Sequence, residues 1–244
     1  MEDGLVKASE QGTPQGSILS PLLSNIYLHY ALDLWFERRT RPKSRGKSRL
    51  FRFADDFVSC HQYRDDAQTY LRELKERLAK FGLEVAEEKT RCLKFGRYAR
   101  KDAREQGKKP EEFTFLGFTH YCGKTGNGYF KVKRRTSRTK MRQALHKLTD
   151  WARRNRNLLT KREMIESGIR RIRGHLNYYA ITDNQRQCQI YADLARKVLF
   201  KWINRKSQRN AYTWRGFLHA CSFLGMPTAA VRWDLNPCRR FEAF

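Results

Sequence analysis

The sequence lacks any apolar run near the roughly 20 residues that a membrane-spanning helix needs, and its first residues lack the apolar stretch of a secretion signal. Both absences argue against a membrane partner, and we expect a cytoplasmic protein. Close-spaced cysteine pairs are missing too. The six cysteines are scattered, and none forms the C-x-x-C spacing of a zinc knuckle or ribbon. We therefore expect reduced, mostly packed thiols.

Acidic residues are scarce. The chain has 25 Asp and Glu against 51 Lys and Arg, a formal net charge of +26 over 244 residues. A compact protein this positive favours a polyanionic partner, most often a phosphate backbone. An anionic membrane surface is the alternative, and nucleic acid is the better hypothesis because no apolar run could anchor the chain. Hydrophobic residues at 40% and aromatic residues at 13% exclude a disordered tail.

The first half of the chain mixes helix and strand patterns, with no internal repeat. Ser20 before Pro21 predicts a helix N-cap, and the apolar residues that follow mark one helical face: Leu23, Ile26, Tyr27, Tyr30 and Leu34. Residues 41–49 are basic and carry Pro, Gly and Ser, which predicts an exposed loop. Residues 50–60 predict a strand, a turn and a second strand. A second helix is expected next, capped by Asp65 or Asp66 and stopped by Gly82.

Short strands are expected next at 83–85, 90–95 and 113–121, with a polar linker at 98–110 and a hairpin turn at 126–128 leading into a strand at 129–133. Strand patterns end near residue 135. Helices are then predicted by apolar faces at Met141 to Trp151, at Ile165 to Tyr179 behind a capping box at Thr160, and at Ile190 to Trp202. A shorter helix fits 214–223. The fold class expected is α+β, an antiparallel sheet with helices followed by an all-α region.

Two adjacent carboxylates, Asp55 and Asp56, stand in an apolar strand setting. Burial of both would be costly without a cation or hydrogen bonds to neutralise them. In a hairpin turn they can project to one edge, where Mg²⁺ takes oxygen ligands and keeps room for phosphates. A solvated Asp-Asp turn without function is the alternative.

Four motifs occur in one order along the chain: Gly12-Thr13-Pro14-Gln15-Gly16, then Phe53-Ala54-Asp55-Asp56, then Glu88-Lys89-Thr90, then Phe115-Leu116-Gly117-Phe118. This order resembles the second half of a group II intron-type reverse transcriptase. The resemblance implies a partial palm over residues 1–122 and a thumb and maturase-like RNA-binding region over 123–244, including Gly174-His175-Leu176-Asn177-Tyr178-Tyr179. It implies RNA-directed DNA synthesis, with RNA, a DNA primer and a deoxynucleoside triphosphate as partners.

The resemblance also assigns roles to single residues. Asp55 and Asp56 would be catalytic carboxylates and ligands of Mg²⁺ in a two-metal nucleotidyl transfer. The residues facing the template and the nucleotide would be Pro14, Gln15, Gly16, Phe53 and Lys89, although a surface role is the alternative for Lys89. Leu116 and Gly117 would form the primer grip.

Two departures from the family pattern matter. Phe53 stands where the family usually has Tyr, which removes a hydroxyl contact. The family's first catalytic aspartate lies upstream of the Pro-Gln-Gly motif, and only 11 residues precede Gly12 here, so that aspartate and the fingers are expected to be missing. We therefore expect this chain alone to be inactive as a polymerase. The alternatives are a non-catalytic RNA-binding maturase module and a truncated remnant of a mobile element.

Basic residues dominate the start of the helical half. Solvated helix faces usually alternate in charge sign, and this stretch does not, which favours contact with RNA. The candidate RNA-binding residues are Arg134, Arg135, Arg138, Lys140, Arg142, Arg153, Arg154, Arg170, Arg171 and Arg173. Aromatic residues such as Tyr178, Tyr179, Trp202 and Trp214 could stack on bases, but core packing is the better expectation for most of them. No Cys and His/Asn pattern of an HNH nuclease follows.

Overall fold

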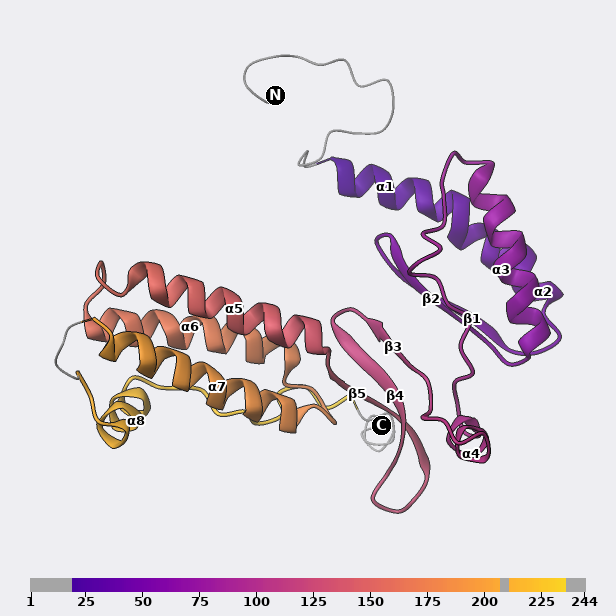
Figure 1. Ribbon diagram of the computed structural model, residues 1–244. Helices are drawn as coiled ribbons and strands as arrows, with labels where there is room; N and C mark the ends of the chain where they lie inside the picture. The colour runs from indigo at the N-terminus through magenta and orange to yellow at the C-terminus, as the bar shows by residue number, and fades with distance from the viewer. Residues whose placement is uncertain (1–18, 207–210, 236–244) are drawn as a thin grey trace, which may run out of the picture. The chain divides into compact units, whose positions relative to one another are not determined.

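The computed structural model describes residues 19–206 and 211–235 and divides the chain into two compact units, one ending at Lys94 and the other beginning at Phe95. Each unit is described by itself. The α+β fold class is confirmed, because antiparallel strands and helices come first and a helical region follows (Figure 1). The motif-based division into 1–122 and 123–244 stays a prediction. Pro14, Gln15 and Gly16 lie outside the described residues. No helix in the described ranges is long and apolar enough to cross a membrane.

The first unit packs a long helix and the separate helix α3 on one face of a two-stranded hairpin. Its helical segments are α1 (Ser20–Leu28), η1 (His29–Asp33), η2 (Phe36–Thr40), α2 (Arg41–Lys43) and α3 (Arg64–Ala79). Its strands are β1 (Ser48–Phe53) and β2 (Asp56–His61), paired antiparallel from Ser48↔His61 to Phe53↔Asp56. The buried residues of the core are Leu32, Phe36, Tyr70, Leu74 and Leu78.

The segments from α1 to α2 form one long helix in which two turns are π-helical. A π turn closes i→i+5 hydrogen bonds, so it shifts the buried face away from the α-helical period. The predicted apolar face needs correction, because α1 itself buries no residue and Leu23, Ile26, Tyr27 and Tyr30 are 45–60% exposed. The buried residues of the long helix come later, at Ala31, Leu32 and Phe36. The N-cap is Leu19, one residue before the predicted Ser20.

Other expectations for this part of the chain need correction as well. Helix α2 continues through Lys43, so the basic loop is limited to residues 44–47. Residues 83–85 and 90–95 form no strand, and the supposed linker contains the short helix α4 (Ala99–Glu105). Few β-branched residues occur there to support a pleated strand. The strand-turn-strand over 50–60 is confirmed, and so is a helix that stops before Gly82, whose φ is +65°. The predicted cap at Asp65 or Asp66 is wrong, because α3 begins at Arg64 and its N-cap is Tyr63.

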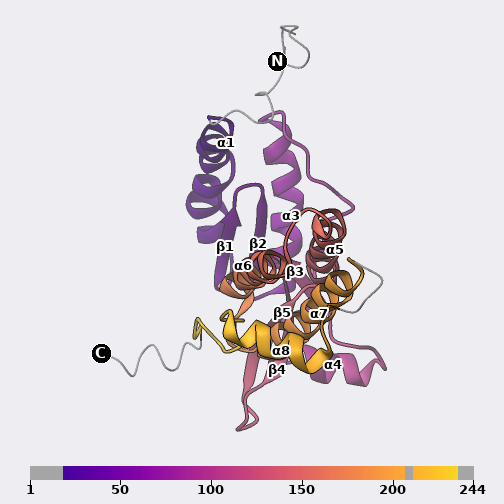
Figure 2. The same cartoon turned by 90° about the vertical axis from the view of Figure 1, so that its left-hand side faces the viewer.

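The second unit combines a three-stranded antiparallel sheet with a helical bundle. The sheet has the order β3 (Glu112–Phe115), β4 (Phe118–Lys124) and β5 (Phe130–Thr136). The helices are α5 (Arg138–Asn155), α6 (Lys161–Tyr179), α7 (Gln185–Asn204) and α8 (Trp214–Phe223), and α5, α6 and α7 run side by side (Figure 2). The expected single strand at 113–121 is wrong, because a tight turn at Leu116-Gly117 divides it.

The bundle core confirms most of the helical predictions. The capping box at Thr160 is present, with the Thr160 side chain and Glu163 bonded reciprocally to the backbone. The α7 face differs from the prediction, since Ile190 and Leu194 are partly exposed and the buried residues are Cys188, Tyr191, Ala195, Leu199 and Ile203. The described cysteines are free thiols, with Cys122, Cys188 and Cys221 buried.

Candidate functional site

The two adjacent carboxylates lie at the tip of the β1–β2 hairpin. Phe53 pairs with Asp56, so Ala54 and Asp55 form a two-residue turn, and both Asp side chains are exposed. Ala54 has a φ of +53°, a left-handed conformation that costs an L-residue roughly 1 kcal/mol. Paired residues of an antiparallel sheet share one face, which places Phe53, 65% exposed, beside Asp56 on the side away from the helices.

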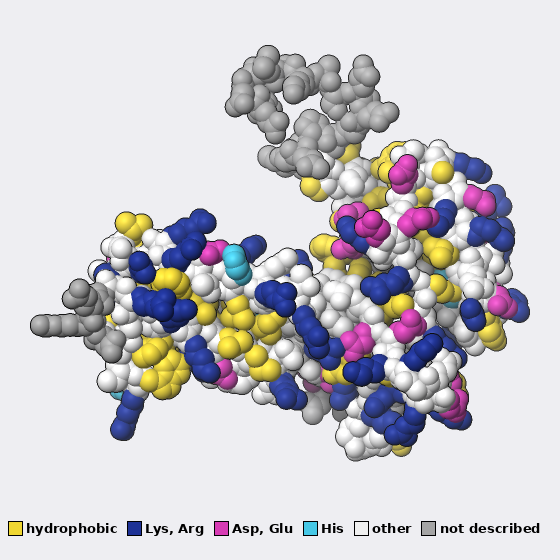
Figure 3. Space-filling view, viewed as in Figure 1, with side chains coloured by type: hydrophobic (Ala, Val, Ile, Leu, Met, Phe, Trp, Pro, Cys, Tyr) yellow, Lys and Arg dark blue, Asp and Glu magenta, His cyan; other side chains and the backbone are white. Residues whose placement is uncertain are grey.

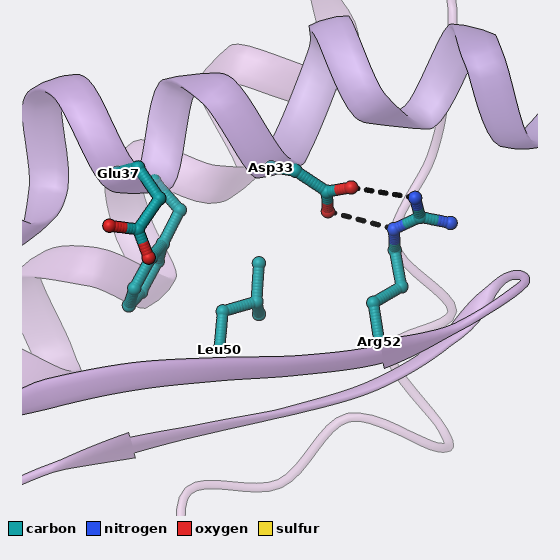
Figure 4. Close-up of a pocket in the computed structure, with 5 residues that line it drawn as sticks. Asp33, Glu37, Leu50 and Arg52 are labelled. Atoms are coloured by element: carbon teal, nitrogen blue, oxygen red, sulfur yellow. Dashed lines mark hydrogen bonds and ion pairs between the residues drawn. The ribbon is translucent and has the colours of Figure 1, made fainter.

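Arg52, one residue before the turn, bonds to three parts of the first unit. Its Nε and Nη2 donate to the two Asp33 carboxylate oxygens at 2.8 and 2.6 Å, as Figure 4 shows. Its Nη1 donates to Asn25 Oδ1 and to the Ala54 carbonyl oxygen, each at 2.9 Å. A single guanidinium therefore connects the long helix to the turn that carries Asp55.

The Arg52–Asp33 pair is partly shielded from solvent, with side chains 13% and 26% exposed. Burial works against ionisation of Asp33, but hydrogen bonds and charge from Arg52, aided by His29, outweigh it and hold the pKa of that carboxyl below its ordinary value. The hydrogen bond to Asp33 raises the pKa of Arg52. A cavity of about 210 Å³ adjoins the pair, lined by Asp33, Phe36, Glu37, Leu50 and Arg52 (Figure 4).

The donor set at the hairpin tip fits a hard divalent cation. Asp55 and Asp56 offer carboxylate oxygens to solvent, and Mg²⁺ is usually held by one or two carboxylates together with water and substrate phosphates. No group of three or more His, Cys, Asp or Glu side chains suited to a metal gathers anywhere in residues 19–206 or 211–235. Asp55 and Asp56 are therefore a pair of carboxylates at the hairpin tip, without a third possible ligand beside them among the described residues.

A second two-residue turn, at Leu116 and Gly117, joins β3 to β4. Both residues have positive φ, +50° and +79°, as a type I′ hairpin requires. The Gly117 carbonyl accepts from the Ser137 amide at 2.9 Å, and the Leu116 carbonyl accepts from the Tyr178 hydroxyl at 2.9 Å. A Cβ on Gly117 would lie 2.7 Å from the Tyr179 hydroxyl at a φ of +79°, so any larger residue would be strained there. The turn is thus held at the start of α5 and the end of α6.

Basic side chains follow α5 away from that turn. Lys140, Lys147 and Arg154 recur at seven-residue intervals, which places them along one line of the helix at spacings of about 10 Å. The methylene stem of Lys140 lies beside Gly117. All three are exposed, and none pairs with an acidic side chain of the described residues. We call these three residues the α5 basic row. Figure 3 shows Lys and Arg predominating over Asp and Glu on the helical part of the second unit, at the left of the view.

The other predicted RNA-binding residues differ in availability. Arg134 and Arg135 lie on β5 and not on the helix, and Arg135 pairs with Glu112 at 2.6 Å. Arg138 and Arg142 are exposed on α5, while Arg153 lies 3.6 Å from Asp150.

The three predicted RNA-binding arginines of α6 make contacts within the protein. Arg170 donates to Ser167 Oγ, Arg171 stacks 4.0 Å from the Trp151 ring centre, and Arg173 donates to the Gly225 carbonyl. Burial lowers the pKa of Arg171, with the charge of Arg170 adding to it.

Lys89 is exposed in a turn after α3, and no contact among the described residues links it to the hairpin tip. Among the aromatics, Trp202 is buried, but Tyr178 is 53% exposed and stacks on Phe118. The residues that sequence reasoning missed are Arg52, Asp33 and Asn25. Alternation in 48–53 places Arg52 on the helix-facing side with Leu50, and that was the available signal.

The comparison with protein families gives the class of the first part of the chain. Residues 3–120 match the family described as reverse transcriptase (RNA-dependent DNA polymerase). This stretch is therefore a reverse transcriptase family domain, and it contains both the Asp55-Asp56 turn and the Leu116-Gly117 turn. Helices α5 to α8 lie beyond the match. A search of curated proteins found no match.

Proposed function

We propose that the chain is the palm and thumb part of an RNA-directed DNA polymerase of the group II intron type. The observation that carries this proposal is the Phe53–Asp56 hairpin, which presents two exposed carboxylates within a reverse transcriptase match. Asp55 and Asp56 would hold Mg²⁺, which when bound neutralises charge on the attacking and leaving oxygens of nucleotidyl transfer. Phe53 would pack beside the nucleotide. Lys89 would add a positive charge near the triphosphate.

In this proposal the second unit holds the template and the primer. The Leu116-Gly117 turn meets the primer, and the α5 basic row, which begins beside that turn, meets the phosphates of the duplex. Phosphate contacts position a nucleic acid without reading its bases, so we assign no RNA sequence. A third carboxylate would complete the metal site from outside the described residues.

The metal site can be tested by Mn²⁺ titration of the full chain in the presence of an RNA template, a DNA primer and a deoxynucleoside triphosphate. Electron paramagnetic resonance would report free Mn²⁺. We expect Asp55→Asn and Asp56→Asn to weaken binding, because each removes a ligand. Asp65→Asn, which removes the same charge from an exposed carboxylate of the same unit, should leave it unchanged. Equal Mn²⁺ affinity in all three variants and in the wild type would refute the proposed site.

Primer extension addresses catalysis itself. We expect no Mg²⁺-dependent extension by the chain alone, because the described residues supply only two carboxylates. Extension that Asp55→Ala abolishes would overturn this expectation and would show that the third carboxylate is present in the chain.

A non-catalytic maturase-like module that binds structured RNA is the second candidate function. The α5 basic row favours it, since unpaired cations of one sign along a helix suit a phosphate backbone whether or not synthesis occurs. This candidate predicts RNA affinity that is unaltered by Asp55→Asn. Loss of RNA binding in that variant alone would count against it.

A further inference from the structure

Arg52 is the only side chain recorded as bonding to the β1–β2 turn among the described residues, and its other partners come from the long helix. We infer that Arg52 is a positioning residue for the metal-binding turn: it orients the Ala54–Asp55 peptide against Asp33 and Asn25 without touching the metal. This inference rests on the proposed function of Asp55.

The geometry of the guanidinium suits this role. Asp33 takes Nε and Nη2 as a fork, which sets the plane of the guanidinium and directs Nη1 toward Asn25 and the Ala54 carbonyl. Four hydrogen bonds are made from one planar group. A lysine carries its three donors on a single nitrogen and cannot reproduce a planar fork, so Arg and Lys are not equivalent here.

The bond to the Ala54 carbonyl acts on Asp55 through the backbone. The peptide unit is planar, so fixing the carbonyl of Ala54 fixes the plane that leads into the Asp55 backbone. The hydrogen bond from Arg52 stabilises a turn that is strained, because Ala54 has a φ of +53°. A two-stranded hairpin is also only marginally stable by itself.

Asp33, which accepts from the Arg52 fork, lies in a well-packed part of the long helix. Asp33 is the last residue of η1, and the buried side chains of Leu32 and Phe36 flank it on the helix. Leu50, on the same face of β1 as Arg52, packs against that core (Figure 4). The Arg77 guanidinium donates to the Tyr30 and Ala31 carbonyls within η1, which anchors the same turn of the helix to α3.

The sign of the effect separates positioning from simple electrostatics. A guanidinium close to a cation site repels the cation, so Arg52→Gln would strengthen metal binding if charge alone mattered. Positioning predicts the opposite. Arg52→Lys keeps the charge and loses the fork, and it should therefore weaken binding.

The experiment compares Arg52→Lys and Arg52→Gln with Arg49→Lys and Arg49→Gln in the full chain. Arg49 is exposed on the same strand, and its side chain makes no hydrogen bond or ion pair with other described residues, so it is a matched control. Two quantities are measured: Mn²⁺ affinity by electron paramagnetic resonance, and amide hydrogen exchange across residues 53–56. We expect both Arg52 variants to weaken Mn²⁺ binding about fivefold, the factor for one lost hydrogen bond of ordinary strength, and to speed exchange at the turn. The Arg49 variants should match the wild type.

Asp33→Asn serves as a second variant that keeps Arg52 in place and removes only the ionic half of the fork. It should fall between the wild type and Arg52→Lys in both quantities, and circular dichroism would verify that each variant is folded. Arg52 variants that equal their Arg49 controls in both quantities would overturn the inference, as would tighter Mn²⁺ binding by Arg52→Gln. If Mn²⁺ binding is already insensitive to Asp55→Asn, the proposed function fails, while amide exchange at the turn still decides whether Arg52 positions it.

Discussion

Salt dependence of duplex binding gives the sharpest test of the α5 basic row. Five exposed cations of α5 make no ion pair with another described residue: Arg138, Lys140, Arg142, Lys147 and Arg154. Each phosphate neutralised lowers the slope of log K against log salt by about 0.9 for a duplex. If all five cations contact phosphates, the slope is about −4.5, and affinity falls roughly 500-fold between about 50 and 200 mM salt.

The perturbation is the triple variant Lys140→Gln, Lys147→Gln and Arg154→Gln, which removes the row and leaves two of the five cations. Its slope should be about −2, and its affinity should fall only about tenfold over the same salt range. Fluorescence anisotropy of a labelled RNA–DNA template–primer duplex would measure both slopes.

A matched control carries the same loss of three charges on α4 of the same unit: Arg100→Gln, Lys101→Gln and Arg104→Gln. It should keep a slope near the wild-type value, because general net charge affects association less than direct phosphate contacts do. A row variant with the wild-type slope, or a control with an equal reduction, would refute the assignment of the row to phosphate contacts.

Three further predictions concern stability, each measured by urea unfolding. Burial between Tyr179 and Tyr191 lowers the pKa of His175 to about 4, so the unfolded state binds more protons than the folded state below about pH 6.5. The free energy of unfolding should therefore fall by about 2 kcal/mol from pH 7 to pH 5. The variant His175→Phe should flatten this pH dependence, and His219→Gln, at an exposed histidine, should not. Gly168→Ala should destabilise by about 1–3 kcal/mol, because its Cβ would lie 2.5 Å from a Leu199 methyl group. Thr160→Ala should cost about 1 kcal/mol by removing the capping box of α6, and unchanged stability would show that the cap does not hold that end.

Local signals predicted much of the fold. The capping box at Thr160, the stop at Gly82 just after α3 and the 126–128 hairpin turn each depend on neighbouring residues, so the sequence alone can predict them. The predicted apolar face of α1 was wrong because α1 buries none of its residues. The long helix packs into the core only from Ala31 onward, and periodicity in the sequence does not show which part of a helix is covered. The division of residues 113–121 into two strands requires a positive φ at Leu116, a conformation that leucine disfavours, so the sequence did not predict it.

For the proposed site, the sequence by itself supplied the candidate residues: the adjacent carboxylates Asp55 and Asp56, and a basic stretch from Arg134 onward. The motif order suggested a reverse transcriptase, and the family comparison shows that class for residues 3–120. Only the tertiary structure decided which side chains act together. Arg52 meets Asp33 and Asn25 across 19 and 27 residues, and Tyr178 reaches Leu116 across 62. Such contacts depend on how distant parts of the chain pack together and not on local periodicity. The two carboxylates could therefore be named from the sequence, and Arg52, which we infer orients their turn, could not.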